Sequence, residues 1–215
     1  MNTLKNKSVL ITCGPTWVPI DDVRVISNIS TGELGQTLAL KCKKRGAKVT
    51  LVEGPVERRM ESNGIVVKPF KYYTDLMRII RHELVEEKKH YDVIFHAAAV
   101  SDYTIKNPLK KKIKSDEPNI TLNLIPLPKL IRSIRKVSPK SLIVGFKLES
   151  DMTEKIALKS TRGLFTEAFC DLVVANTLKE QNYLGFVVEQ DKILSSGTTR
   201  SGVVDQLLDI VEGRL

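Results

Sequence analysis

Residues 8–35 constrain the fold more than any other stretch, because a short apolar run there leads into a long polar loop and then an amphipathic segment. Residues 9–11 (Val-Leu-Ile) are typical of a parallel strand covered on both faces. The Gly-Pro pair at 14–15 ends this strand. A buried strand followed by a helix is the opening unit of an α/β fold.

The helix of this unit is predicted to begin near Gly32, since Ser30 and Glu33 have the spacing of a capping box. Its apolar stripe ends before Gly46, a residue type that commonly ends helices. The stripe consists of Leu34, Leu38, Ala39 and Cys42.

The loop between strand and helix is much longer than the glycine-rich turn of a dinucleotide-binding fold. It is either a surface excursion or an ordered binding loop. We favour the second interpretation, because Val23, Val25 and Ile26 could anchor the loop against the body of the protein. Its polar residues are Asp21, Asp22, Arg24, Ser27 and Asn28.

Strands and helices alternate along the rest of the chain, which predicts a single domain over residues 1–215. We expect a Rossmann-like α/β fold, doubly wound, with a mainly parallel sheet and helices on both faces. Strands are predicted at 48–53, 64–67, 92–97, 142–146 and 171–175, an exposed strand at 121–125 and a hairpin at 186–195. Helices are predicted from Thr74 to about residue 89, from Pro128 to about 136, at 152–169 with an interruption at Gly163, and at 203–211.

The charge and composition narrow the class of partner. The formal net charge is +9, and five lysines fall within residues 106–114. Such a dense cluster, with only Tyr103 as a nearby aromatic residue, favours a small polyphosphate over a nucleic acid. No stretch is apolar enough to span a membrane, and the three separated cysteines indicate neither disulfides nor a zinc site. We expect a cytoplasmic protein.

The sequence lacks the motifs of several classes of enzyme. The sequence contains no nucleophile elbow, no P-loop and no histidine pair at metal-ligand spacing, and we expect His96 to be a core residue. A third glycine in register with Gly32 and Gly35 is missing, which weakens a dehydrogenase interpretation. Glu53, at the end of a predicted strand, keeps that interpretation open.

Polar residues instead gather after the first and fourth predicted strands, whose carboxyl ends should meet at one sheet edge. Asn28 could donate and accept hydrogen bonds, Arg24 could clamp a carboxylate or phosphate, and Asp102 could accept from a hydroxyl or amine. Lys112 or Lys114 could neutralise a polyphosphate. This set suits transfer at phosphorus or at an activated acyl group.

Residues 11–16 (ITCGPT), 19–21, 23–24, 26–28 and 30–35 resemble the opening of the phosphopantothenate-cysteine ligase family, also called phosphopantothenoylcysteine synthetases. The resemblance continues through residues 97–103 (AAAVSDY), 112–114, 144–149 and 171–176. In many bacteria this domain is the carboxyl half of a fusion with a flavin-dependent decarboxylase. The chain resembles the free-standing synthetase, so no flavin is expected.

The resemblance implies a ligase that joins 4'-phosphopantothenate to L-cysteine through an acyl-nucleotide intermediate in coenzyme A synthesis. CTP is the expected nucleotide, with ATP possible, and Mg²⁺ would bridge the triphosphate. Relatives imply a homodimer and an association with a separate decarboxylase. The alternatives are a noncatalytic nucleotide-binding protein on the same scaffold and an NAD(P)-dependent oxidoreductase.

By motif, the resemblance assigns Asn28 to the acyl phosphate, with Arg24 shaping the same loop and Lys112 meeting the phosphates. The expected nucleotide-binding residues are Ala98, Asp102, Lys112, Pro128, Lys129, Leu130, Ile131 and Phe146. Two departures stand out: Glu33 replaces a frequent basic residue, and Leu164 and Ala168 occupy the register of a lysine pair. Lys155, Lys159 or Arg162 could replace that pair.

Overall fold

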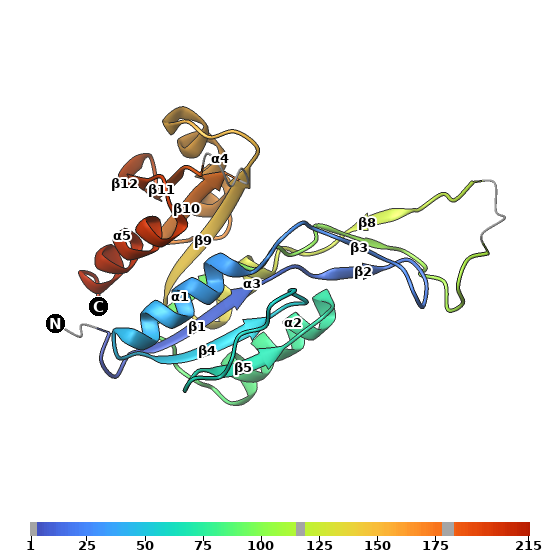
Figure 1. Cartoon of the computed structure of the whole chain (residues 1–215), viewed down its shortest axis with the longest axis horizontal. Helices are drawn as coiled ribbons and strands as arrows, with labels where there is room; N and C mark the ends of the chain where they lie inside the picture. Colours follow the sequence, from blue (N-terminus) through green and yellow to red (C-terminus); the bar gives the residue numbers. More distant parts are fainter. Residues whose placement is uncertain (1–3, 115–118, 178–182) are drawn as a thin grey trace.

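A computed structural model describes residues 4–114, 119–177 and 183–215. Its centre is an eight-stranded sheet in the order β12-β11-β10-β9-β6-β1-β4-β5 (Figure 1). The strands from β5 to β10 pair in parallel, and β11 and β12 add an antiparallel edge. The mainly parallel sheet predicted from sequence is confirmed. The strands are β1 Ser8–Cys13, β4 Lys48–Glu53, β5 Val66–Pro69, β6 Val93–His96, β9 Leu142–Glu149, β10 Leu172–Thr177, β11 Gly185–Glu189 and β12 Lys192–Gly197.

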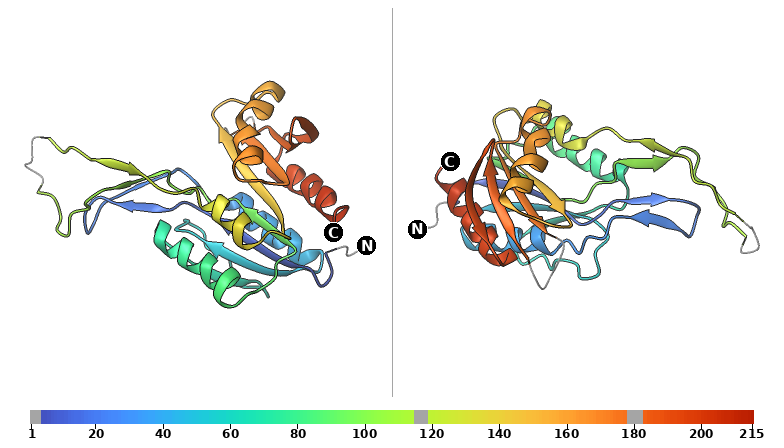
Figure 2. Two further views of the ribbon diagram at one scale, coloured as in Figure 1. Left: turned by 180° about the vertical axis from the view of Figure 1, so that it is seen from behind. Right: turned by 90° about the horizontal axis from the view of Figure 1, so that it is seen from above.

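Helices cover both faces of the sheet, as expected for a doubly wound fold (Figures 1 and 2). Val9 and Ile11 of β1 pack into the cluster with α1 and α5, whereas Leu10 packs into the cluster with α2 and α3. This alternation explains why residues 9–11 of β1 are apolar without interruption. No helix in the described ranges is long and apolar enough to cross a membrane. The helices are α1 Glu33–Lys44, α2 Tyr73–Arg81, α3 Leu130–Val137, α4 Glu154–Thr166 and α5 Arg200–Glu212.

Two antiparallel ribbons form an arm that extends away from the sheet (Figures 1 and 2). One ribbon pairs β2 (Trp17–Pro19) with β3 (Val25–Ser27), and the other pairs β7 (Tyr103–Ile105) with β8 (Leu124–Pro126). The long loop after β1 is therefore ordered, as predicted. The predicted anchoring role of Val23, Val25 and Ile26 is wrong, because they are 62%, 39% and 38% exposed on the arm.

Several predicted helix boundaries also change. The N-cap of α1 is Gly32 in the left-handed region, φ 74°, rather than Ser30 of a capping box. A Cβ at Gly32 would lie 2.7 Å from Cγ1 of Val56, so the turn leaves no room for a side chain. Helix α2 begins one residue before Thr74, and α4 runs through Gly163 without interruption. Pro128 precedes α3, whose N-cap is Lys129.

A buried carboxylate fixes the end of the second predicted helix, where α2 continues as the π-helical segment η1 (His82–Glu86). The Glu83 side chain is 1% exposed and accepts hydrogen bonds from Lys68 at 2.6 Å, Lys89 at 3.1 Å and Tyr91 at 2.5 Å. Burial alone would raise the pKa of Glu83, but these hydrogen bonds outweigh it and lower the pKa to about 2. The network holds the helix end against β5.

We predict that Glu83→Gln lowers the free energy of unfolding at neutral pH by about 1–3 kcal/mol, because a charged acceptor for two lysines is lost. Since the folded pKa is depressed, the stabilisation is present above the ordinary value of 4.5 and disappears as the pH falls towards 2. Urea unfolding at several pH values measures both effects. The exposed Glu86→Gln variant is the control, and equal losses in the two variants would contradict the assignment.

Candidate active-site cavity

The loops that follow β1 and β6 are joined at the carboxyl edge of the sheet. The amides of Ala97 and Ala99 donate to the carbonyls of Thr12 at 3.0 Å and Gly14 at 2.9 Å. The amide of Ser101 donates to the hydroxyl of Thr16 at 2.8 Å. These bonds continue the parallel pairing beyond the strands, so the two loops predicted to form the site share one rigid base.

A buried threonine-histidine pair supports this base. The Thr12 hydroxyl accepts a hydrogen bond from the Ala98 amide at 3.2 Å and lies 2.9 Å from Nδ1 of His96. His96 is 8% exposed, and burial lowers its pKa to about 4. The imidazole is therefore neutral at physiological pH. The prediction that His96 is a satisfied core residue is confirmed.

Helix α1 begins directly beside the end of β1. A Cβ at Gly35 would lie 2.3 Å from Cβ of Cys13, so glycine permits the helix to approach the strand this closely. The first amides of α1 have no helical acceptor and carry partial positive charge. This geometry brings a region suited to anionic groups to the same sheet edge.

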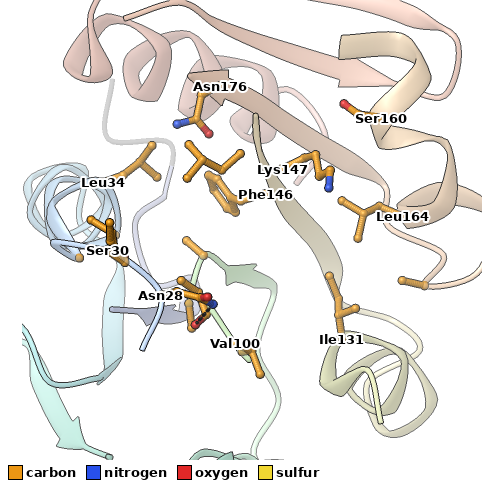
Figure 3. A pocket seen from close by; sticks show the side chains of 18 of the residues that line it. Asn28, Ser30, Leu34, Val100, Ile131, Phe146, Lys147, Ser160, Leu164 and Asn176 are labelled. Carbon is orange, nitrogen blue, oxygen red and sulfur yellow. Dashed lines mark hydrogen bonds between the residues drawn. The ribbon is translucent and has the colours of Figure 1, made fainter. Parts of the chain in front are cut away.

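These elements surround a cavity of about 930 Å³ that also reaches β9, β10, α3 and α4 (Figure 3). Five of the predicted site residues lie together in its lining: Asn28, Ala98, Lys129, Ile131 and Phe146. Four basic and two acidic side chains line it, which gives an excess of positive charge. These are Lys129, Arg132, Lys147, Arg200, Glu33 and Glu167.

Asn28 reaches the cavity from the segment between β3 and α1. Its amide nitrogen donates to the Ala99 carbonyl at 3.1 Å, which fixes the orientation of the side-chain amide (Figure 3). The bond joins the β1 loop to the loop after β6 by a side chain as well as by backbone. Asn28 is thus held at the junction of the two predicted binding loops.

Arg24 lies outside the cavity lining and acts within the arm. Its guanidinium contacts the Asp21 carboxylate at 2.5 Å and donates to the Ile113 carbonyl at 3.2 Å. The Asp21 carboxylate also accepts the amides of Ile113 at 3.0 Å and Val23 at 2.9 Å. The hydrogen bond from the Ile113 amide, together with those from the Val23 and Arg24 amides and the Arg24 guanidinium, holds the pKa of Asp21 well below its usual range. This cluster ties the lysine-rich segment to the β2–β3 ribbon.

The other predicted residues do not line the cavity, and Lys112 lies out on the arm, where its neighbour Ile113 is bonded to Asp21 and Arg24. Lys112 is exposed on the lysine-rich segment beside Ile113. Asp102 accepts a hydrogen bond from the lining residue Lys129 at 2.5 Å. The Pro128 carbonyl accepts from the Tyr73 hydroxyl at 3.0 Å, and Leu130 is 4% exposed in the core.

Sequence reasoning missed several lining residues, including Ser30, Lys147, Ser160, Asn176 and Arg200. Lys147 and Asn176 belong to the carboxyl-terminal halves of parallel strands, the position that signals a ligand site in this fold class. Among the described residues, no group of three or more His, Cys, Asp or Glu is arranged to hold a metal ion.

The two positions at which the sequence departs from the family pattern, Glu33 and the Leu164–Ala168 pair, differ in their surroundings. Glu33 is exposed, and its carboxylate lies 3.2 Å from the guanidinium of Arg200. Leu164 and Ala168 do line the cavity, whereas the suggested substitutes Lys155, Lys159 and Arg162 do not. The basic residues that do line this side of the cavity are Arg132 and Lys147.

The Glu53 side chain has a structural role and is not available to bind a ribose. It is 2% exposed and accepts hydrogen bonds from the Gln36 amide at 2.9 Å and the Met60 backbone at 3.1 Å. A ribose would have to displace these partners. The dehydrogenase interpretation thereby loses its acidic residue.

Residues 4–204 match the family model for the DNA/pantothenate metabolism flavoprotein C-terminal domain. The chain belongs to this family. It is 36% identical over 219 residues to the coenzyme A biosynthesis bifunctional protein CoaBC of Thermococcus kodakarensis. That alignment covers 99% of this chain and 53% of the relative, so the chain spans about half the relative's length.

Two solved structures share the fold. The DNA/pantothenate metabolism flavoprotein from Streptococcus pneumoniae has a TM-score of 0.84 at 24% identity, covering 97% of this chain and 100% of that one. A Cab2 variant in complex with phosphopantothenate-cysteine has a TM-score of 0.73 at 20% identity, covering 97% and 87%. These likenesses support the Rossmann-like architecture.

We predict that Asp21→Asn exposes the lysine-rich segment to proteolysis, because an amide cannot accept all the hydrogen bonds of the Asp21 carboxylate. Trypsin should cleave within residues 106–114 several-fold faster than in the wild type, with a similar melting temperature since the arm lies outside the core. The exposed neighbour Asp22→Asn is the control. Equal cleavage rates in all three proteins would contradict the linkage.

Proposed function

We propose that the protein is a ligase that joins 4'-phosphopantothenate and L-cysteine at the expense of a nucleoside triphosphate. The observation that carries the proposal is the cavity in which Asn28 meets the loop after β6, in a chain of this family. The relative named CoaBC is a coenzyme A biosynthesis protein, and the Cab2 variant binds phosphopantothenate-cysteine. The positive lining suits these phosphate-bearing substrates.

The proposed reaction has two steps. The carboxylate of phosphopantothenate attacks the α-phosphate of the nucleotide, releases pyrophosphate and forms an acyl nucleotide. The cysteine amine then attacks the acyl carbon, forms the amide bond and releases the nucleoside monophosphate. Both steps depend mainly on positioning and charge stabilisation, which a rigid base of joined loops supplies.

The proposed roles follow the position of each residue. Asn28 binds the acyl phosphate from the fixed loop junction, while Ala98, Ile131 and Phe146 line the nucleotide site. Lys129 contributes charge there and is oriented by Asp102, and Pro128 and Leu130 set the start of α3 beside it.

Other groups would act from outside the cavity lining. Lys112 is proposed, by family resemblance, to contact the phosphates from the arm segment that Asp21 and Arg24 hold. Mg²⁺ bound together with the nucleotide would neutralise part of the triphosphate charge, since no cluster of described residues is arranged to hold the ion by itself. No residue of this domain is assigned to a flavin.

CTP is the proposed nucleotide, by family resemblance, and rates with CTP and ATP compared at equal concentration test that choice. We propose a cytoplasmic location, which suits the buried free cysteines. A separate decarboxylase, acting on the product of the ligation, is a proposed partner, and co-purification tests that association.

We propose a homodimer that uses the arm, because the arm exposes apolar residues outside any core. These include Val23, Leu109, Ile120 and Leu124. Sedimentation of the wild type and of Leu124→Lys tests this assembly. A monomeric wild type would contradict it.

The proposed function predicts that repeated turnover, with release of nucleoside monophosphate, requires both phosphopantothenate and cysteine, whereas phosphopantothenate alone supports only the single release of pyrophosphate that forms the acyl nucleotide. Quantifying both products with each substrate omitted in turn is the test. Release independent of both substrates would contradict the ligase and favour simple hydrolysis. Nucleotide binding without turnover would favour a noncatalytic protein, and nicotinamide cofactor binding would favour an oxidoreductase.

We predict that Asn28→Asp reduces turnover on the order of a hundredfold, because a carboxylate would face the acyl phosphate and lose the bond to Ala99. The melting temperature should hardly change, since Asn28 lies in an exposed loop. Asn63→Asp, at another exposed loop position, is the matched control. Full activity of Asn28→Asp would overturn its proposed role.

A further inference from the structure

The cavity extends to both faces of β9. Phe146 packs towards the α1 face. A Cβ at Gly145 would lie 3.4 Å from both Ile131 and Leu164, on the opposite face. Because side chains alternate along a strand, Lys147 points to the same face as Gly145. We call the space lined by Ile131, Arg132, Lys147, Ser160 and Leu164 the α4 side of the cavity.

Ser160 carries an unpartnered polar atom on the α4 side. Its hydroxyl oxygen is buried and has no hydrogen-bond partner among the described residues. A serine within a helix commonly satisfies itself by bonding a carbonyl of the preceding turn, as Thr161 does with Ala157 at 2.8 Å. A buried hydroxyl without such a bond is unfavourable unless a ligand or water completes it.

Lys147 supplies a charge to the same space. Figure 3 shows its amine directed towards Leu164, with Ser160 on the neighbouring turn of α4. The Lys147 amine lies 3.3 Å from Glu149, in a pair whose side chains are 41% and 34% exposed. Partly exposed pairs of this kind contribute little stability, so an anionic ligand can compete for the amine.

We propose that Lys147 and Ser160 form a subsite for a phosphate group on the α4 side of the cavity. The ammonium group donates to phosphate oxygens as a compact charge, and the Ser160 hydroxyl donates one further hydrogen bond. Arg132, paired with Glu167 at the rim, adds charge nearby. The proposal rests on the proposed ligase function and assigns it a phosphate contact made from β9 and α4.

Two substrates could supply this phosphate group. One source is the triphosphate of the nucleotide, and the other is the 4'-phosphate of phosphopantothenate. Steady-state kinetics with each substrate varied separately distinguishes them, because loss of the subsite raises the KM of the substrate whose phosphate it holds.

The test uses the full chain with Lys147→Gln, Lys147→Arg, Ser160→Ala and the double variant Lys147→Gln/Ser160→Ala. Lys147→Gln should raise one of the two KM values about tenfold, and Ser160→Ala should raise the same KM about threefold. Lys147→Arg should recover most of the affinity, and the double variant should lose less than the product of the single effects. Lys155→Gln, an exposed lysine of α4 outside the lining, is the control for charge.

Calorimetric titration with inorganic pyrophosphate gives a readout that does not depend on turnover. Weaker binding by Lys147→Gln and Ser160→Ala, but not by Lys155→Gln, is the expected result. Equal pyrophosphate affinity in all variants, or unchanged KM values in an active enzyme, would overturn the subsite. An inactive wild type that still shows the expected binding pattern would reject the ligase function and retain the subsite.

Discussion

The site depends on the parallel pairing of the loops after β1 and β6. The amides of Ala97 and Ala99 bond to the β1 loop, Ala98 bonds to the Thr12 hydroxyl, and Asn28 bonds back to Ala99. Without this pairing, the loops would be independent surface segments. With it, the Asn28 loop and the loop after β6 have a fixed relative position, which is what chemistry based on positioning requires.

This pairing is possible because the strands beneath it are buried on both faces. β1 lies between β4 and β6, with α1 and α5 on one face and α2 and α3 on the other. Close approach at Gly35 brings the α1 amides to the end of the same strand. The sheet therefore positions a polar loop junction, a helix start and the ends of β9 and β10 around a single cavity.

The core architecture could be predicted from sequence. Short apolar runs indicate buried strands, apolar residues at helical spacing indicate helices, and the two patterns alternate along the chain. The helix caps were harder, since Ser30 and Thr74 have cap chemistry but Gly32 and Tyr72 have the required backbone position. Val23, Val25 and Ile26 were misinterpreted because apolar character does not distinguish an anchor from an exposed arm. Lys147 and Ser160 were missed because only the packing of α4 on β9 brings them together.

The most direct test of the account is a crystal structure of the protein with a non-hydrolysable CTP analogue and phosphopantothenate. We predict the nucleotide between Ala98, Phe146 and the start of α3, with the phosphopantothenate carboxylate close to Asn28 and directed at the α-phosphate. A nucleotide bound outside the cavity, or a carboxylate far from Asn28, would contradict the account.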